Sequence, residues 1–592
     1  MKITSFVHDG QFDCGLVDGQ GHIYRLDGCE AVRAISPSQR LPALLAMDRD
    51  ERRQVVKQFE FTAESKIHPR VLAPAVPLCP LFFYGHGNSP TIWRRQQGPR
   101  FRWNIPRMTH FRVRPWTSLS GNGDTVELPV KASLAHGAEF AVVLGKDAYR
   151  VPETEAESYI AGVLVMNDLF MSGLHGDYDN LPDEELSRYM VMSLDCMSKS
   201  ADGNGAIGPW ITTVEELEDA YTARMGTQRL SAMRKSSYAS AYLYDLIIQT
   251  SIDGKLSERG HTSATLLGAE YLIAYFSQFM TLPAGTILGL GAPSWDGQMV
   301  DIPEQLGSRS KLEVSIEQVG DLQTHIERVG CHRERKRSPF LARVQRWGMD
   351  ENKTKKSPGR SVWICRGNYL KADEIEGVPE SNRYCANLYP PGVLGKPGAP
   401  LVLAPHMGAV ECEVHLAGVI GRPCYNIEEG EALECLAGVT VMLHLRDRSL
   451  GHRIKTPTDY ETRGVHYLGG CADGFARLSP VVPLTHADDL DSLVMSVSIQ
   501  DGDMVQTHSG GYRNGLNGMI AMCTRQITLL PDDVLSLGRS GSPLVLAENT
   551  YVDGKVLHAE IENLGRIDCT LKDHRNPEAQ HGNTHGLYPE LE

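Results

Sequence analysis

The sequence lacks any apolar run that approaches the ~20 residues of a membrane-spanning helix. Its opening stretch, MKITSFVHDGQFDCG, also lacks the apolar core of a signal peptide. The 13 cysteines are scattered and include no C-x-x-C pair, which argues against a disulfide framework and against a thiolate zinc site. We therefore expect a cytoplasmic protein that does not associate with a membrane.

Positive charge is also scarce. Lys+Arg number 59 against Asp+Glu 73, and the formal net charge is -14. This balance disfavours a nucleic-acid partner, because such binding neutralises phosphates with basic side chains. A small-molecule substrate fits better, and the sequence leaves open whether the chain forms a homo-oligomer. At roughly 150 residues per domain, 592 residues predict two to four domains.

The chain contains an internal duplication. GAEFAVVLGK at 137–146 and ECEVHLAGVIGR at 411–422 share a strand-like apolar run closed by glycine and a basic residue. Glu139 and His415 differ by 276 positions, and so do Asp168 and His444. Flanking motifs follow in the same order at slightly different offsets, with YGHGN answered by CRGNY at 280 and KSAD by GCAD at 271. A constant offset over many residues predicts two homologous copies.

The patterning predicts a β-dominated fold with few helices. Short runs rich in β-branched residues and bounded by glycine are typical of strands buried on both faces. Helices are expected only in a few stretches, such as TVEELEDAYTARM and SATLLGAEYLIAYFSQF. The predicted domains are a small N-terminal β domain at 1–70, a first copy at 71–330, a basic linker at 331–360, a second copy at 361–572 and a polar tail at 573–592.

The order of these motifs resembles the fumarylacetoacetate hydrolase superfamily. The first copy carries YGHGN, GAEFAVVLGK, GVLVMND, KSAD, GPW and TLPAGTILGLGAP, and the second carries CRGNY, EVHLAGVIGR, GVTVMLH, CADG and LLPDDVLSLG. The resemblance implies a mixed α/β fold with two β-roll domains in tandem, packed as an intrachain pseudo-dimer. It also implies a divalent metal and cleavage or isomerisation of oxo and enol acids. Neither copy shows the H-x-x-E that hydrolytic members carry after the GN motif.

In the first copy the resemblance implies metal ligands at Glu139 and Asp168, with Lys199 as a catalytic cation. Carboxylates at i and i+2 on a strand share one face, and a third from a neighbouring strand completes an oxygen site that chelates a 2-oxo acid. The first glutamate of that pattern is Gly137 here. The alternative is a relic site in which Glu139 pairs with Lys199. His86 is a candidate acid or base, or a histidine placed by loop packing.

In the second copy the same stations hold Glu413, His415 and His444, and glycine replaces the lysine at Gly470. One carboxylate and two imidazoles form the ligand set typical of non-haem Fe2+ and are compatible with Zn2+ or Mn2+. The alternative is that two histidines fill polar sites whose metal was lost. Arg448 is a candidate partner for a substrate carboxylate, or forms a surface salt bridge. Glu411 is expected to be solvated.

Three functions remain open. The first is a metal-dependent enzyme that acts on a small oxo or enol acid, by carbon-carbon bond cleavage, decarboxylation or isomerisation, with Mg2+, Mn2+, Fe2+ or Zn2+. The second is an iron oxygenase-like enzyme that uses Glu413, His415 and His444. The third is an inactive scaffold or binding protein. If the ligand exchange from carboxylate to imidazole favours transition metals, the second copy is the principal metal centre.

Overall fold

The structure is a computed structural model, and the residues that it describes form four β-sheets. Among the described residues, no helix is both long and apolar enough to cross a membrane. The described residues are 1–8, 11–68, 82–86, 110–129, 134–171, 196–226, 241–265, 267–292, 309–329, 338–347, 360–369, 386–449, 467–484 and 489–575.

The first copy consists of a large sheet and a five-stranded sheet. The large sheet contains, in spatial order, β11 (Gly205–Thr213), β10 (Ile160–Met171), β9 (Leu134–Leu144), β14 (Ile287–Gly289), β5 (Phe82–His86) and β6 (His110–Val113), with β7 (Leu119–Ser120) paired to β11. The five-stranded sheet has the order β13 (Lys255–His261), β12 (Ile247–Ile252), β15 (Arg309–Ile316), β16 (Gly320–Val329) and β8 (Thr125–Pro129).

The second copy repeats both sheets in the same order, which confirms the duplication. Its larger sheet contains β22 (Ala476–Leu478), β21 (Leu436–Asp447), β20 (Val410–Ile420), β25 (Val534–Ser536), β17 (Val362–Cys365) and β18 (Ala386–Tyr389), with β26 (Leu544–Leu546) paired to β20. Its five-stranded sheet contains β24 (Met504–His508), β23 (Val494–Ile499), β27 (Val556–Ile561), β28 (Gly565–Asp573) and β19 (Leu401–Leu403).

The two strands that head the repeat form the middle of each large sheet. All eleven residues of β9 and all eleven of β20 are buried, as expected for β-branched runs covered on both faces. In the first copy Asp168 of β10 lies opposite Gly137 of β9. In the second copy His444 of β21 lies directly opposite Glu413 of β20. The register therefore brings Glu413 and His444 together across one strand pair, whereas in the first copy Glu139 lies opposite Met166.

The predicted helices are present. The first lies within TVEELEDAYTARM and the second within SATLLGAEYLIAYFSQF, as α6 (Val214–Met225) and α8 (Ala269–Ser277). The shorter helix α4 (Glu153–Ala156) contacts α8, and α11 (Leu516–Thr524) belongs to the second copy. The sequence therefore located the main helices of the first copy correctly.

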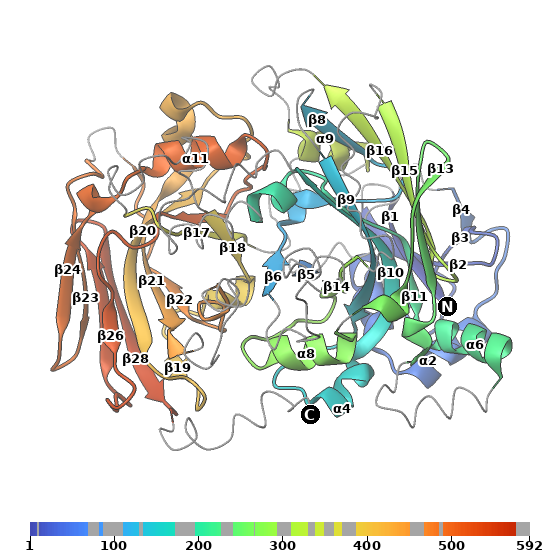
Figure 1. Ribbon diagram of the computed structural model, residues 1–592, viewed down its shortest axis with the longest axis horizontal. Helices are drawn as coiled ribbons and strands as arrows, with labels where there is room; N and C mark the ends of the chain where they lie inside the picture. Colours follow the sequence, from blue (N-terminus) through green and yellow to red (C-terminus); the bar gives the residue numbers. More distant parts are fainter. Residues whose placement is uncertain are drawn as a thin grey trace, which may run out of the picture.

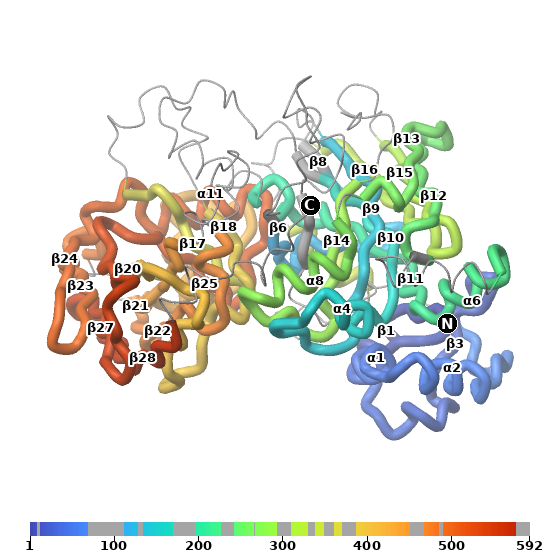
Figure 2. Tube along the Cα trace, turned by 60° about the horizontal axis from the view of Figure 1, so that its bottom comes forward, coloured from blue at the N-terminus to red at the C-terminus, as the bar shows by residue number. Residues whose placement is uncertain are grey.

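The N-terminal segment joins the first copy's large sheet through β1. Strand β1 (Lys2–His8) pairs with β11, and β2 (Gln11–Val17), β3 (Ile23–Arg25) and β4 (Lys66–Ile67) extend the sheet outward. Strands β2 and β3 pair antiparallel across the turn within GLVDGQGHIYR. Helices α1 (Pro37–Ala46) and α2 (Arg49–Gln58) follow, and Figure 2 shows them at the edge of the molecule. The domain boundaries themselves stay a prediction.

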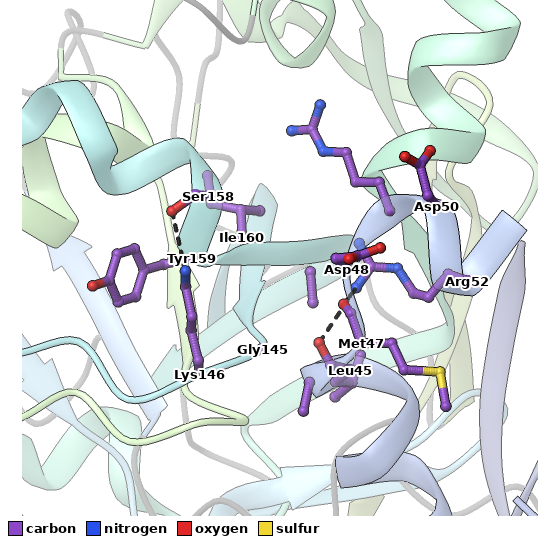
Figure 3. A pocket seen from close by; sticks show the side chains of 13 residues that line it. Leu45, Met47, Asp48, Asp50, Arg52, Gly145, Lys146, Ser158, Tyr159 and Ile160 are labelled. Carbon is purple, nitrogen blue, oxygen red and sulfur yellow. Dashed lines mark hydrogen bonds between the residues drawn. The ribbon is translucent and has the colours of Figure 1, made fainter. Parts of the chain in front are cut away.

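The turn between α1 and α2 packs on the first copy beside Gly145. A side chain at Gly145 would collide with the carbonyl oxygen of Leu45, because a Cβ there would lie 2.2 Å away. A cavity of about 440 Å³ lies next to this contact, where Lys146 Nζ donates to Ser158 Oγ at 3.2 Å (Figure 3). None of the predicted site residues lines this cavity.

The two copies pack side by side and share one apolar core (Figure 1). Two matching polar contacts relate them: Thr528 N and Oγ1 donate to Asp202 at 2.9 and 2.5 Å, and Thr281 N and Oγ1 donate to Asp473 at the same distances. Asp202 and Asp473 occupy equivalent positions in the repeat. Reciprocal contacts of this kind are the property of a two-fold interface, so the predicted intrachain pseudo-dimer is confirmed.

The segment expected to be a linker contains the helix α9 (Pro339–Arg346), which contacts both copies. Ser338 caps it and lies 2.5 Å from Thr528 of the second copy, oxygen to oxygen. The fully buried Arg343 donates to the Thr117 carbonyl of the first copy at 2.9 Å. The segment 331–360, which was predicted to be a linker from its basic composition, therefore includes a helix with Phe340, Arg343 and Val344 buried.

Replacing Asp202 with asparagine is expected to flatten the pH dependence of stability. Burial raises the pKa of Asp202 from 3.8 to about 6, although hydrogen bonds from Thr528 oppose the shift. The folded state thus holds this proton at a pH where the unfolded chain has released it, so stability falls as pH rises from about 4 to about 6. A shift of about two units corresponds to about 3 kcal/mol. Thermal unfolding of both proteins from about pH 4 to about pH 7 measures the difference.

The matched control is Asp473→Asn at the equivalent, solvent-exposed position, which should show a smaller difference. A stability difference between Asp202→Asn and the wild type that stays constant with pH would contradict the expectation.

Candidate metal centre

The predicted ligands of the second copy form a buried cluster. Glu413 and His415 lie two residues apart on β20 and so face the same side, and His444 faces them from β21. One ligand atom from each lies within 4.8 Å of the other two. Within the part of the chain that the structure describes, this is the one group of three or more such side chains close enough to hold a metal ion.

The imidazole of His444 is held by a backbone carbonyl. Its Nε2 lies 3.1 Å from the oxygen of Gly470, so Nε2 carries the proton and the Nδ1 lone pair faces Glu413. Gly470 occupies the position of Lys199 in the repeat, and a Cβ there would lie 2.9 Å from His444 Cε1. A side chain at position 470, such as the lysine of the first copy, would therefore collide with the imidazole of His444 in this position.

The imidazole of His415 is held by a hydroxyl. Its Nδ1 lies 2.9 Å from Ser536 Oγ, and its Nε2 lies 3.0 Å from Glu413 Oε2. Ser536 Oγ also accepts a hydrogen bond from Gly538 N at 3.1 Å. A serine hydroxyl can donate or accept, so it suits either tautomer of His415. Oxygen partners on the outer nitrogens are the usual support of metal-binding imidazoles.

An arginine that the sequence analysis missed lies inside the cluster. Arg366 Nη1 donates to Glu413 Oε2 at 2.9 Å, and its Nη2 lies 3.4 Å from His444 Nδ1. Nε and Nη2 also donate to the Tyr389 hydroxyl at 3.2 and 3.0 Å. The guanidinium is thus a cation beside the carboxylate, on the side where a metal would bind.

The protonation states suit metal ligation. Burial would raise the pKa of Glu413, but the charge of Arg366 and the hydrogen bond from His415 outweigh it and hold that pKa well below its usual range. Burial lowers the pKa of His444 to about 4, and it also lowers the pKa of His415. At neutral pH the cluster therefore has an ionised carboxylate and two neutral imidazoles, the forms that bind metals.

The residues present fit a divalent metal. Glu413 Oε1 is buried and has no hydrogen-bond partner among the described residues, which leaves one carboxylate oxygen for a further ligand. His444 already directs a lone pair inward, and His415 can do so by changing tautomer. Arg366 is the group that competes for the same position.

The first copy arranges its side chains differently. Asp168 forms buried ion pairs with Lys199 and with Arg114, and Arg114 also donates to the Lys199 carbonyl. The lysine ammonium lies on Asp168, and the relic alternative, in which Glu139 pairs with Lys199, stays a prediction. Two internal cations thus already compensate the charge of this aspartate.

Glu139 lies beside the same strand pair and accepts a hydrogen bond from Gly291 N at 3.2 Å. A Cβ at Gly137 would lie 3.6 Å from Glu139 Oε1 and 3.8 Å from Asp168 Cβ, so the three positions are adjacent. The metal and catalytic roles of Glu139, Asp168 and Lys199 stay predictions. The backbone of His86 pairs with His110 at the end of β5, and its side chain lies outside the described residues.

A row of charged side chains leads from the second centre to the surface. Arg446 forms an ion pair with Glu411, and both are buried. The expectation that Glu411 is solvated was therefore wrong, because β21 supplies an arginine directly opposite it. Arg448 lies at the outer end of the row, where its side chain is 55 % exposed and its Nε is 3.9 Å from Glu411 Oε1.

The repeat register could have found the missed residues. Arg366 stands in CRGNY where the first copy has His86 in YGHGN. Arg114 and Tyr389 each precede a proline that caps a short 3-10 turn, Trp116–Ser118 in the first copy and Pro391–Val393 in the second. The change from His86 to Arg366 at equivalent positions of the repeat is the sequence signal that indicates Arg366.

The comparison with family models decides the classification. The model described as fumarylacetoacetate (FAA) hydrolase C-terminal matches residues 85–327 and again residues 372–572. The chain belongs to the fumarylacetoacetate hydrolase family. Its two matched segments are the two copies of the fold, so this family member is a tandem one, as the motif order predicted.

Several curated proteins are similar to this tandem fumarylacetoacetate hydrolase family member. The 4-hydroxyphenylacetate degradation bifunctional isomerase/decarboxylase of Escherichia coli is 23% identical over 464 residues, which is 78% of this chain and 90% of that protein. The mitochondrial oxaloacetate tautomerase FAHD1 of Arabidopsis thaliana is 27% identical over 38% of this chain and 82% of its own length. An uncharacterized protein of Archaeoglobus fulgidus is 26% identical over 37% of this chain and 69% of its own length.

Solved structures of the family are also similar. Maleylpyruvate hydrolase from Sphingobium sp. SYK-6 is 19% identical, with a TM-score of 0.38, over 56% of this chain and 100% of that chain. A structure of the same enzyme in complex with manganese(II) ion and pyruvate has the same TM-score and 20% identity, over 55% of this chain and 99% of that one.

Proposed function

We propose that the protein is a metal-dependent enzyme that acts on a small oxo or enol carboxylic acid, with its metal centre in the second copy. The reaction breaks or rearranges a bond next to the carbonyl group, by carbon-carbon cleavage, decarboxylation or isomerisation. The observation that carries the proposal is the buried convergence of Glu413, His415 and His444. Relatives named isomerase/decarboxylase and oxaloacetate tautomerase support this reaction class.

The residues of this chain have separate parts in the proposal. Glu413, His415 and His444 would hold the metal, which when bound supplies Lewis-acid polarisation of a substrate oxo group. Gly470 and Ser536 orient the two imidazoles from behind. Arg448, half-exposed at the outer end of the charged row, would pair with the substrate carboxylate.

A second candidate is an iron-dependent oxygenase-like enzyme at the same three residues. One carboxylate and two imidazoles are the side chains of the facial triad of non-haem Fe2+ oxygenases. The metal that the protein retains on purification distinguishes the candidates: iron favours the second, whereas Mg2+, Mn2+ or Zn2+ favours the first.

The proposed reaction class predicts exchange of the proton next to an oxo group. With Mg2+ or Zn2+ added, the protein should speed loss of the C3 proton signal of oxaloacetate in D2O, followed by NMR, by about 100-fold or more over metal alone. Glu413→Gln should lose this activity, because a neutral amide no longer balances the metal's charge. If the protein binds metal but accelerates neither proton exchange nor decarboxylation of a panel of 2-oxo acids, the proposal fails.

A further inference from the structure

Arg366 is the one charged side chain in contact with Glu413 that is not a predicted ligand, among the contacts found in the described residues. Its guanidinium donates to Glu413 Oε2, the oxygen that also faces His415 at 3.0 Å. Its Nη2 lies 3.4 Å from the inward nitrogen of His444. The guanidinium therefore contacts two of the three residues that would hold a metal ion, Glu413 and His444.

The charges of the cluster balance without a metal. Glu413 contributes one negative charge and Arg366 one positive charge, and the two groups are in direct contact at 2.9 Å. A divalent ion entering beside a stationary guanidinium would leave a buried excess of positive charge, which is strongly unfavourable in a low-dielectric interior. Metal entry consequently requires the guanidinium to leave Glu413.

In the first copy other basic side chains compensate the negative charge of a buried carboxylate. There Arg114 and Lys199 both contact Asp168. Arg366 does not occupy the position of Arg114 or of Lys199 in the repeat. In each copy, however, a basic side chain contacts a carboxylate of the predicted site, Glu413 or Asp168. The recurrence indicates that internal compensation of the carboxylate is a property of both halves.

We propose that Arg366 is an internal cation that competes with the metal for Glu413, so that metal binds the second copy only by displacing the guanidinium. This inference rests on the proposed metal centre and extends it. Arg366 is a positioning residue: it sets how tightly the centre binds metal and keeps the metal-free cluster intact. The Tyr389 hydroxyl, which accepts from Nε and Nη2, holds the guanidinium in the competing position.

The test is the affinity of the metal-free full chain for Co2+, Mn2+ and Zn2+, measured by equilibrium dialysis and by the visible absorption of bound Co2+. Arg366→Gln removes the competing charge and is expected to tighten binding at least tenfold. The control Arg446→Gln removes another buried arginine from the same strand pair, one that contacts Glu411 instead of Glu413, and should change affinity less than about twofold.

The wild-type chain provides an independent measurement that does not depend on a folded variant. Modification of arginines by phenylglyoxal, mapped by mass spectrometry, should increase at Arg366 when metal is added, whereas the fully buried Arg343 should stay unreactive. Unchanged reactivity of Arg366 at metal saturation would overturn the proposal, as would equal affinities of the wild type and Arg366→Gln.

The outcomes separate this inference from the proposed function. If the wild type binds metal as tightly as Arg366→Gln through the three ligands, the metal centre stands and the competition is wrong. If neither protein binds any of the three ions, the metal centre itself is wrong and the competition fails with it.

Discussion

Replacing His444 with alanine is expected to weaken metal binding by about 100-fold or more and to abolish metal-dependent activity. Loss of an outer-shell partner alone costs about 10- to 100-fold in affinity, and His444 is one of the three proposed ligands in the cluster. Metal content after dialysis and the Co2+ absorption band measure the effect. Glu413→Gln, which keeps the shape of the side chain, should give a loss of similar size.

Glu139→Ala in the first copy is the matched control. Glu139 occupies the position of His415 in the repeat, but its neighbour Asp168 is already paired with two cations. Metal content should therefore remain largely intact in this variant. If the bound metal instead disappears with Glu139 and persists in His444→Ala, the first copy is the working half and the assignment is reversed.

Replacing Asp168 with alanine is expected to destabilise the protein by about 3 to 5 kcal/mol, the range found when one partner of a buried ion pair is removed. Arg114 and Lys199 are both buried against this carboxylate, and the substitution would leave two positive charges in the interior without a counter-charge. The shift of the urea midpoint, followed by tryptophan fluorescence, measures the change.

A second substitution tests whether charge is the cause. Lys199→Met in the Asp168→Ala background removes one of the two uncompensated cations and should recover at least about 1 kcal/mol. If the double variant is no more stable than Asp168→Ala, the loss comes from packing alone, and the buried charge cluster of the first copy does not contribute as described.

The sequence by itself predicted the fold and the residues that form the buried cluster of the second copy. Local periodicity and the constant 276-residue offset between Glu139 and His415 fixed the strands, the duplication and the tandem architecture. Strand alternation placed Glu413 and His415 on one face, and the same offset placed His444 opposite them. These inferences succeed because they depend on backbone periodicity, which is a local property of the chain.

Only the tertiary structure decided what lies against the site residues. The guanidinium of Arg366 comes from the loop after β17, 47 residues before the carboxylate it contacts, and no periodicity relates the two. Lys199 lies against Asp168, a residue of β10 that is 31 residues away in the chain. The helix α9 was missed because Arg343, a residue type that indicated a solvated linker, is fully buried and donates a hydrogen bond to the Thr117 carbonyl of a distant segment. Partner choice among buried charges is a long-range property, so composition alone could not determine it.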